Sequence, residues 1–260
     1  MNKNVLELNG LCVDYGELRA VKLLDIKINR GERFCLVGES GSDKTSVAMA
    51  VAKLLPDSAK VSGAVRMNGT DIYAADEKEL REIRRKDLSI IFQDATGSLI
   101  PGVTVKKQFY RVIRYRLGIS DKEKIGQIAA EHLNRVGLTD HGRILNSWPD
   151  ELSGGMCQRV VIAMALCVKP ALVIAYEPTS ALDVITQQKI LELLLTLQQD
   201  THFALLFITH DLRIAAHYSN RIGVMQNGSL IETSTTDQFF SKPVNPYSES
   251  LVFSAKKLSV

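Results

Sequence analysis

Eight consecutive residues of this 260-residue chain, from Gly38 to Thr45 (GESGSDKT), have the composition of a loop that binds phosphate. The apolar run Arg33–Val37 before them predicts a buried strand, and the pattern over Thr45–Leu55 predicts a helix. Between a strand and a helix, the backbone N–H groups of such a loop surround a phosphate, and the helix N-terminus adds partial positive charge. Lys44 would then reach the β- and γ-phosphates of a nucleotide, and Thr45 would ligate Mg²⁺. A strand-to-helix turn with an N-cap serine is the alternative interpretation.

Asp43 stands directly before the lysine, where a phosphate loop of this type has glycine. Glycine allows backbone torsions that cost other residues free energy, and it allows the backbone to approach the phosphate closely. The Asp43 carboxylate also adds negative charge beside a polyphosphate. Two like charges ~4 Å apart repel by roughly 4 kcal/mol at an effective dielectric constant of about 20. We therefore expect this loop to bind nucleotide weakly.

Five further segments and one aromatic residue accompany the phosphate loop in a fixed order along the chain. Tyr15 lies 23 residues before Gly38. The segments are Ile91–Asp94 (IFQD), Leu152–Arg159 (LSGGMCQR), Ala171–Pro178 (ALVIAYEP), Ser180–Asp183 (SALD) and Ile208–Asp211 (ITHD). In this order the chain resembles the ATP-binding subunits of ABC transporters over nearly its whole length. The segments correspond to the Q-loop, the signature, the Walker B strand, the D-loop and the switch histidine of that family.

Three longer stretches narrow the resemblance to the peptide/nickel-uptake branch of ABC importers. They are SGGM followed by QRVVIAMAL, IFQD followed by SLIP, and a tail with NPYSESL. Many peptide-type members of this branch have a longer, cysteine-bearing tail that ligates an iron–sulfur cluster. No cysteine follows Cys167 here, so no iron–sulfur cluster is expected.

Strand-like and helical segments alternate along most of the chain, which predicts an α/β fold with a parallel sheet. The resemblance implies a P-loop NTPase with a RecA-like parallel-sheet core, an N-terminal antiparallel β subdomain and a helical subdomain. We expect one domain over residues 1–260: a nucleotide-binding core at about 1–92 and 153–235, a helical subdomain at about 93–152 that ends at the signature, and a tail at about 236–260 appended to the core. Ser120 to Glu123 (SDKE) predict a capping box at the start of a helix.

The resemblance also assigns roles to individual residues. Glu177 would orient or deprotonate the attacking water, His210 would contact the γ-phosphate, and Gln93 would meet Mg²⁺ or water and relay nucleotide state. The alternatives without a catalytic role are that Glu177 is a solvated carboxylate at a strand end, His210 a structural histidine and Gln93 a surface glutamine. The family's ATP contacts correspond here to Tyr15, Gly38, Glu39, Ser40, Gly41, Ser42, Asp43, Lys44, Thr45, Ser46, Ser153, Gly154, Gly155 and Asp183. Its Mg²⁺ contacts correspond to Thr45 and Gln93.

Tyr176 is a second departure, because the family has the Walker B aspartate at the position before Glu177. A neutral phenol cannot balance a divalent ion, and its bulk occupies space that metal and water need. Tyrosine is a good strand former, so folding need not suffer. Both departures damage the same triphosphate–Mg²⁺ cradle, and such losses are non-additive.

In the family, ATP is sandwiched between two subunits, one supplying the phosphate loop and the other its signature. We therefore expect a second ATPase subunit that is a different chain, two permease subunits and, indirectly, a substrate-binding protein. The location would be peripheral, at the cytoplasmic face of the cell (inner) membrane. The hypothesis is that this chain's intact signature serves ATP bound to the partner, for uptake of a peptide, nickel or a metal chelate. The isolated chain would be weakly active or inactive.

Three alternatives stay open beside that hypothesis. The chain could be competent despite both changes, or the changes could be engineered. It could be a non-hydrolysing regulatory or vestigial subunit. It could be a soluble ABC protein acting on DNA or ribosomes, although those usually have tandem cassettes or coiled-coil insertions, and neither is found here.

Composition excludes several other classes. Apolar residues make up 45% of the chain and charged residues 23%, as in ordinary globular proteins. The net charge of +3 is too small to indicate a nucleic-acid partner. The four cysteines form no CxxC pair and have no histidine at metal-ligand spacing, which favours a reduced compartment. The N-terminus has no apolar core of a signal peptide, and no run is long enough to span a bilayer.

Overall fold

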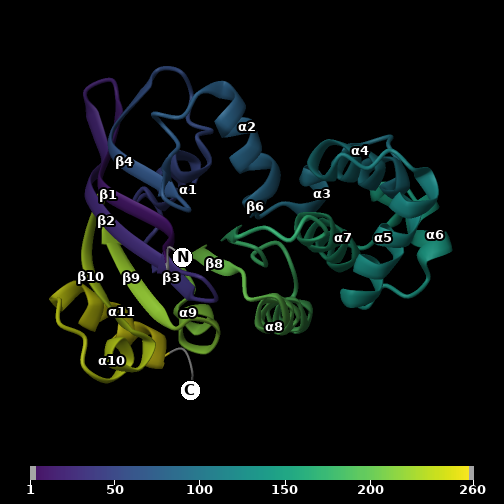
Figure 1. Ribbon diagram of the computed structural model, residues 1–260. Coiled ribbons are helices and arrows are strands. Elements are labelled where there is room, and N and C mark those ends of the chain that lie inside the picture. Colours follow the sequence, from purple (N-terminus) through teal and green to yellow (C-terminus); the bar gives the residue numbers. More distant parts are fainter. Residues whose placement is uncertain (1–3, 258–260) are drawn as a thin grey trace. The chain divides into compact units, whose positions relative to one another are not determined.

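The computed structural model describes residues 4–257, and they divide into two compact units that are treated separately below. The first unit comprises residues 4–80 and 204–257, and the second comprises residues 81–203. The expected α/β architecture is confirmed, with both parallel and antiparallel strand pairs (Figure 1). The functional division into core, helical subdomain and tail stays a prediction, and residues 258–260 of that tail lie outside the described part. Among the described residues, no helix combines the length and apolar character needed to cross a bilayer.

The first unit contains a four-stranded antiparallel sheet in the order β2-β1-β4-β5. Its strands are β1 (Asn4–Tyr15), β2 (Leu18–Asn29), β4 (Ala59–Met67) and β5 (Thr70–Asp71). In the sequence, apolar and polar residues alternate over Val5–Leu8 and Leu24–Ile28, which predicts only a small antiparallel piece. The strands are longer because irregularities in the pairing of β1 with β2 interrupt the apolar–polar alternation without ending the ladder.

The same unit contains β3 and β8, a parallel pair whose residues are almost all buried. Such continuous apolar runs are typical of parallel strands covered on both faces. Strand β9 pairs with β3 on its other side, and β10 pairs with β9 antiparallel. The bounds are β3 (Arg33–Val37), β8 (Ala204–Thr209), β9 (Arg221–Gln226) and β10 (Ser229–Thr235).

Four helices belong to this unit, and the last two form the tail, which packs against the unit. Phe239 on α10 and Val252 on α11 are buried, and both helices contact α9 (Figure 1). The tail therefore contributes to the apolar core of this unit. The helices are α1 (Lys44–Ala52), α9 (Leu212–Tyr218), α10 (Thr236–Ser241) and α11 (Pro246–Lys257).

The second unit is mainly helical and contains the parallel strand pair β6 and β7. Helix α2 (Glu77–Lys86) leads into it from the first unit. Helices α4 to α7 form the cluster that Figure 1 draws around α5. The remaining elements are β6 (Leu88–Ile91), α3 (Ala95–Ser98), α4 (Val105–Leu117), α5 (Lys122–Arg135), α6 (His141–Asn146), a 3₁₀ turn (Pro149–Glu151), α7 (Gly154–Leu166), β7 (Leu172–Tyr176) and α8 (Val184–Thr201).

Helix α5 begins one residue later than the predicted capping box implies. Asp121 is its N-cap, and one carboxylate oxygen accepts from the backbone N–H of Glu123 at 2.8 Å and of Lys124 at 3.1 Å. Ser120 lies outside the helix. The charged carboxylate is the better acceptor at the positive end of a helix, so Asp121 takes the position that we assigned to the serine.

Arg116 ties the end of α4 to β6. Its guanidinium donates to the carbonyl oxygens of Arg85 and Leu88, at 2.8 and 2.6 Å, and to Ser89 Oγ at 2.9 Å. Ser89 Oγ in turn donates to the carbonyl oxygen of Ala165 on α7, at 2.8 Å. The network therefore joins α4 and α7 to β6, the strand that precedes Gln93.

We predict that Arg116→Met lowers the free energy of unfolding by about 1.5–3 kcal/mol, because two partly buried carbonyls and Ser89 Oγ lose a charged donor. Urea denaturation measures the change. Arg111→Met is the matched control, since Arg111 is exposed on the same helix. Equal effects of the two substitutions would contradict the structural role of this network.

Candidate functional site

The phosphate loop lies between β3 and α1, as the sequence predicted. A Cβ added at Gly38 would collide with the carbonyl oxygen of Met225 on β9, so the loop must leave β3 through a glycine. The loop ends where α1 begins at Lys44, and its backbone therefore opens onto a helix N-terminus. This is the setting that favours an anion.

Lys44 lies inside the loop, with only 8% of the residue exposed. Its Nζ donates to the carbonyl oxygens of Gly38 and Glu39, both at 2.8 Å, and to Ser42 Oγ at 3.1 Å. Ser42 Oγ also donates to the carbonyl oxygen of Glu39, at 2.9 Å. The Lys44 ammonium group is thus held within the loop, where it could bind a phosphate.

Asp43 has φ 69° and ψ 22°, a left-handed conformation that glycine adopts freely and that costs other residues free energy. Its side chain makes no capping hydrogen bond to α1. Burial raises the pKa of Asp43, against the opposing effect of Lys22 and Lys44. The position therefore keeps the backbone of a glycine while adding a partly desolvated carboxylate.

Two other residues predicted to bind nucleotide meet beside the loop. The Tyr15 hydroxyl and Ser46 Oγ are 3.2 Å apart, which links the end of β1 to the first turn of α1. Ser46 is buried, whereas Thr45 beside it is exposed. The predicted aromatic thus lies next to the phosphate-loop helix.

His210 follows β8 at the same edge where Gly38 follows β3, because Val37 pairs with Thr209 in the parallel ladder. His210 and Gly38 line one pocket of about 270 Å³, together with Leu251 of α11. Asp211 caps α9 and forms an ion pair with Arg213, with 2.7 Å between the closest atoms. Burial favours a higher pKa for Asp211, but its bonds with Arg213 outweigh that effect and keep its pKa below the ordinary value.

In the second unit, the segments with Gln93 and Glu177 also share one edge, because Ile91 of β6 pairs with Ala175 of β7. Gln93 is exposed and Glu177 is buried. Glu177 has φ 43°, which is a strained torsion for a residue with a side chain, and its carbonyl oxygen accepts from the N–H of Ser180. Non-glycine residues hold such torsions chiefly at functional sites.

The signature forms a helix N-terminus that faces solvent. Ser153 caps α7 and accepts from the N–H of Met156 at 3.3 Å, and both Ser153 and Gly154 are exposed. A Cβ added at Gly155 would lie 2.8 Å from Cγ2 of Thr186, so the turn packs on α8 only with glycine there. An exposed helix N-terminus with a serine hydroxyl can bind an anion from outside the chain.

Asp183 belongs to the same surface as the signature. It caps α8 by accepting from the N–H of Thr186 at 3.0 Å, and hydrogen bonding with Thr186 lowers its pKa. Leu182 beside it lies against Gly154, at 3.5 Å from a Cβ built on that glycine. The segments Ser180–Asp183 and Leu152–Arg159 are therefore packed together within this unit.

The donor set fits the phosphates of a nucleotide better than it fits Mg²⁺. The loop offers backbone N–H groups, a helix N-terminus and Lys44. The residues that we expected to hold the metal offer only neutral oxygens, with Thr45 in the first unit and Gln93 and Tyr176 in the second. Within residues 4–257, no three His, Cys, Asp or Glu side chains gather as metal ligands would. If Mg²⁺ binds, its remaining ligands would be water and phosphate oxygens.

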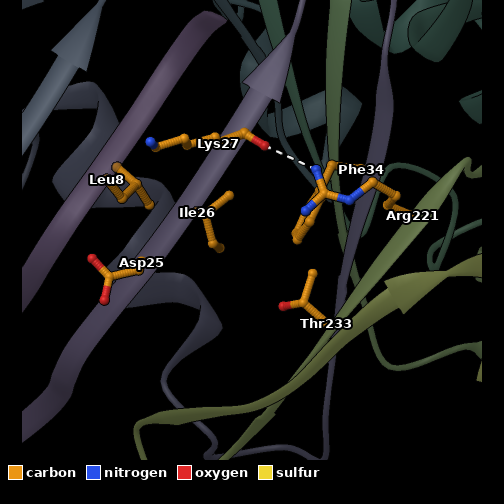
Figure 2. Close-up of a pocket in the computed structure, with 7 residues that line it drawn as sticks. All are labelled: Leu8, Asp25, Ile26, Lys27, Phe34, Arg221 and Thr233. Atoms are coloured by element: carbon orange, nitrogen blue, oxygen red, sulfur yellow. Dashed lines mark hydrogen bonds between the residues drawn. The ribbon is translucent and has the colours of Figure 1, made fainter.

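A second cavity in the first unit, of about 280 Å³, has no features of a site (Figure 2). Arg221 in its wall donates to the carbonyl oxygen of Lys27 at 3.1 Å and to Glu32 Oε1 at 2.7 Å, and it lies over the Phe34 ring. Its charge is already paired with Glu32, and its bond to Lys27 joins β9 to β2.

Sequence reasoning missed Tyr247, whose hydroxyl accepts from the Glu39 N–H at 3.3 Å. The tail motif NPYSESL was used only to identify the branch. Asn245 followed by Pro246, the first residue of α11, could have been used to predict the start of this helix. Nothing in the sequence pattern, however, indicates that the helix reaches the phosphate loop.

Comparisons with known proteins agree with this geometry. A family model described as ABC transporter matches residues 21–180. The oligopeptide transport ATP-binding protein OppD of Bacillus subtilis (strain 168) is 40% identical over 98% of this chain and 72% of that protein. The glutathione import ATP-binding protein GsiA of Salmonella typhimurium (strain LT2) is 36% identical over 99% of this chain, which spans only 43% of GsiA. A dimeric post-hydrolysis structure of the ATP-binding cassette MJ0796, bound to ADP and Pi, has a TM-score of 0.77 and 29% identity, covering 89% of this chain and 98% of that one.

We predict that Asp43→Asn raises the affinity for ATP at least about tenfold, because it removes a negative charge beside the phosphates. Asp43→Gly should raise it further by also removing the side chain. Titration calorimetry with ATP measures both. Asp57→Asn, at an exposed position of the same unit, is the control for net charge. Equal affinities for the wild-type chain and Asp43→Asn would refute the repulsion argument.

Proposed function

We propose the function of this chain on the basis of its family. The chain belongs to the ABC transporter family, as an ATP-binding subunit of the peptide-importer branch. It has the P-loop NTPase fold of that family. ABC subunits of this kind bind ATP, are peripheral to the membrane and work with membrane permeases. The proposed function is to couple ATP, held at the interface with a second ATPase subunit, to the uptake of a small peptide.

The proposed division of labour is asymmetric. The chain's own cradle has Asp43 in the loop and Tyr176 in place of the metal-holding aspartate, so we expect that site to be slow or silent. Its signature is undamaged, with Ser153 exposed as the cap of α7. That exposed cap is the observation that supports the proposal, since it can donate to the γ-phosphate of ATP bound to the partner.

Within the chain's own cradle, we propose that Lys44 binds phosphate and that Glu177 holds the attacking water. Lys44 would exchange its carbonyl acceptors for phosphate oxygens, and His210 at the adjacent strand end would contact the γ-phosphate. Bound Mg²⁺ would neutralise charge on the phosphates. The neutral Tyr176 weakens the hold on that ion, and hydrolysis should suffer more than binding does.

The proposed partners are a second, different ATPase subunit and two permease subunits, with a substrate-binding protein acting through the permease. We propose the cytoplasmic face of the membrane as the location. The OppD relative is named for oligopeptide transport and GsiA for glutathione import, which supports a peptide as cargo. Both relatives are longer than this chain.

We propose that a permease segment contacts the second unit around α4, within residues 94–116. A cavity of about 770 Å³ opens there between α4, α5 and α6. Phe109, Ile125 and Leu145 give it an apolar floor, and Lys106 and Lys107 stand at its edge. Such a site fits a short amphipathic segment with acidic residues.

A non-hydrolysing regulatory subunit is the second candidate function, favoured by the two departures in one cradle. It differs from the first in one observable. The asymmetric proposal requires turnover in the assembled complex that depends on Ser153, whereas a purely regulatory subunit leaves turnover independent of this residue.

We predict that Ser153→Arg lowers the ATPase rate of the reconstituted pair at least about tenfold, because the arginine fills the place of the γ-phosphate. Ser58→Arg, an exposed serine in the first unit, is the matched control. Unchanged turnover with Ser153→Arg would eliminate the asymmetric proposal and favour the regulatory one.

We predict that Lys106→Glu with Lys107→Glu reduces recovery of the permease with this chain, because two charges of the docking edge are reversed. Quantitative co-purification from membranes measures the recovery. Lys60→Glu, on β4 of the other unit, is the control. Full recovery of the permease with the double variant would place the docking surface elsewhere.

A further inference from the structure

The tail helix α11 contacts the phosphate loop directly. The Glu39 N–H donates to the Tyr247 hydroxyl at 3.3 Å, across 208 positions of sequence. Leu251, one helical turn after Tyr247, lines the pocket that also contains Gly38 and His210. One face of α11 therefore meets both the phosphate loop and the switch histidine.

Tyr247 is held in place from its own side by a chain of hydrogen bonds. Its backbone N–H donates to Asn245 Oδ1 at 2.9 Å. The buried Glu232 carboxylate on β10 accepts from the N–H of Val244, at 3.1 and 3.2 Å, and from the N–H of Asn245 at 3.0 Å. The start of α11 is thereby anchored to the sheet, and the phenol is a fixed acceptor. Burial also raises the pKa of Tyr247, so the phenol stays neutral.

Both backbone polar groups of Glu39, its N–H and its carbonyl oxygen, are therefore hydrogen-bonded. Its N–H is bound by Tyr247, and its carbonyl oxygen accepts from Lys44 Nζ at 2.8 Å, from Ser42 Oγ at 2.9 Å and from the Ser42 N–H at 3.2 Å. A phosphate that recruits Lys44 removes one of these three bonds on the carbonyl side. The bond on the N–H side does not involve Lys44 and can persist.

We propose that Tyr247 is a positioning residue for the phosphate loop. Its hydroxyl fixes the Glu39 peptide from the tail, so that the loop keeps its shape when Lys44 turns from the loop carbonyls to phosphate. The hydrogen bond between the Glu39 N–H and the Tyr247 hydroxyl does not depend on the proposed function. Its effect on ATP binding does rest on that function. The tail thus supports nucleotide binding.

Hydrogen exchange of the nucleotide-free full chain, measured by mass spectrometry, tests the positioning role. Tyr247→Phe removes the acceptor, and we expect residues 38–45 to exchange at least about threefold faster. Tyr73→Phe is the matched control, because it removes a similar bond, from the Tyr73 hydroxyl to the carbonyl oxygen of Ala50 on α1, at 3.0 Å. Unchanged exchange of residues 38–45 in Tyr247→Phe, or the same increase in Tyr73→Phe, would overturn the proposal.

ATP affinity tests the consequence in a chain with Asp43→Gly and Tyr176→Asp, in which binding should be strong enough to measure. Adding Tyr247→Phe should raise the Kd for ATP about threefold to tenfold, whereas adding Tyr73→Phe should leave it unchanged even if both lower the melting temperature equally. An unaltered Kd with Tyr247→Phe overturns the positioning role. If the restored chain binds no ATP at all, the proposed function fails, and the exchange experiment still decides the role of Tyr247.

Discussion

The pairing of Val37 with Thr209 in a parallel ladder is the constraint that brings the phosphate loop and His210 together. Parallel strands that start together also end together, so the residues after β3 and after β8 must lie at one edge. The phosphate loop and His210 are therefore neighbours although 172 positions separate Gly38 from His210. The pairing of Ile91 with Ala175 does the same for the Gln93 and Glu177 segments in the second unit. Burial of these strands on both faces fixes the register, because a shift would expose apolar residues.

At Asp43 the backbone has the geometry of a glycine, but the side chain has the chemistry of a carboxylate. The chain still turns through the left-handed torsion that glycine serves, but a carboxylate now projects from it. The fold therefore tolerates the substitution while the chemistry of the loop changes. Tyr176 is a similar case, because it ends β7, which pairs with β6 in a regular ladder, with a neutral side chain where we expected an aspartate. Both changes leave the signature untouched, since it belongs to a different helix N-terminus.

Much of this could be predicted because the relevant signals are local. Glycines, the lysine and hydroxyls at fixed spacing identify the phosphate loop, and β3 was predicted with the bounds that the structure has. Helix caps were harder, as Asp121 shows, because neighbouring residues compete for the same N–H groups. The contact of Tyr247 with Glu39 could not be predicted, since no periodicity relates residues 208 positions apart. The lengths of β1 and β2 were underestimated because bulges break the alternation on which the prediction relied.

The inward position of Lys44 has a thermodynamic consequence for any anion that enters the loop. The lysine already makes three hydrogen bonds with the protein, so a phosphate must replace these bonds, because Lys44 offers no unused donor. The number of hydrogen bonds on Lys44 need not change, but a neutral carbonyl acceptor is exchanged for a charged phosphate oxygen. Attraction then comes mainly from the electrostatic field of the loop and the release of ordered water and counterions. Ionic strength should therefore strongly affect the occupancy of this loop.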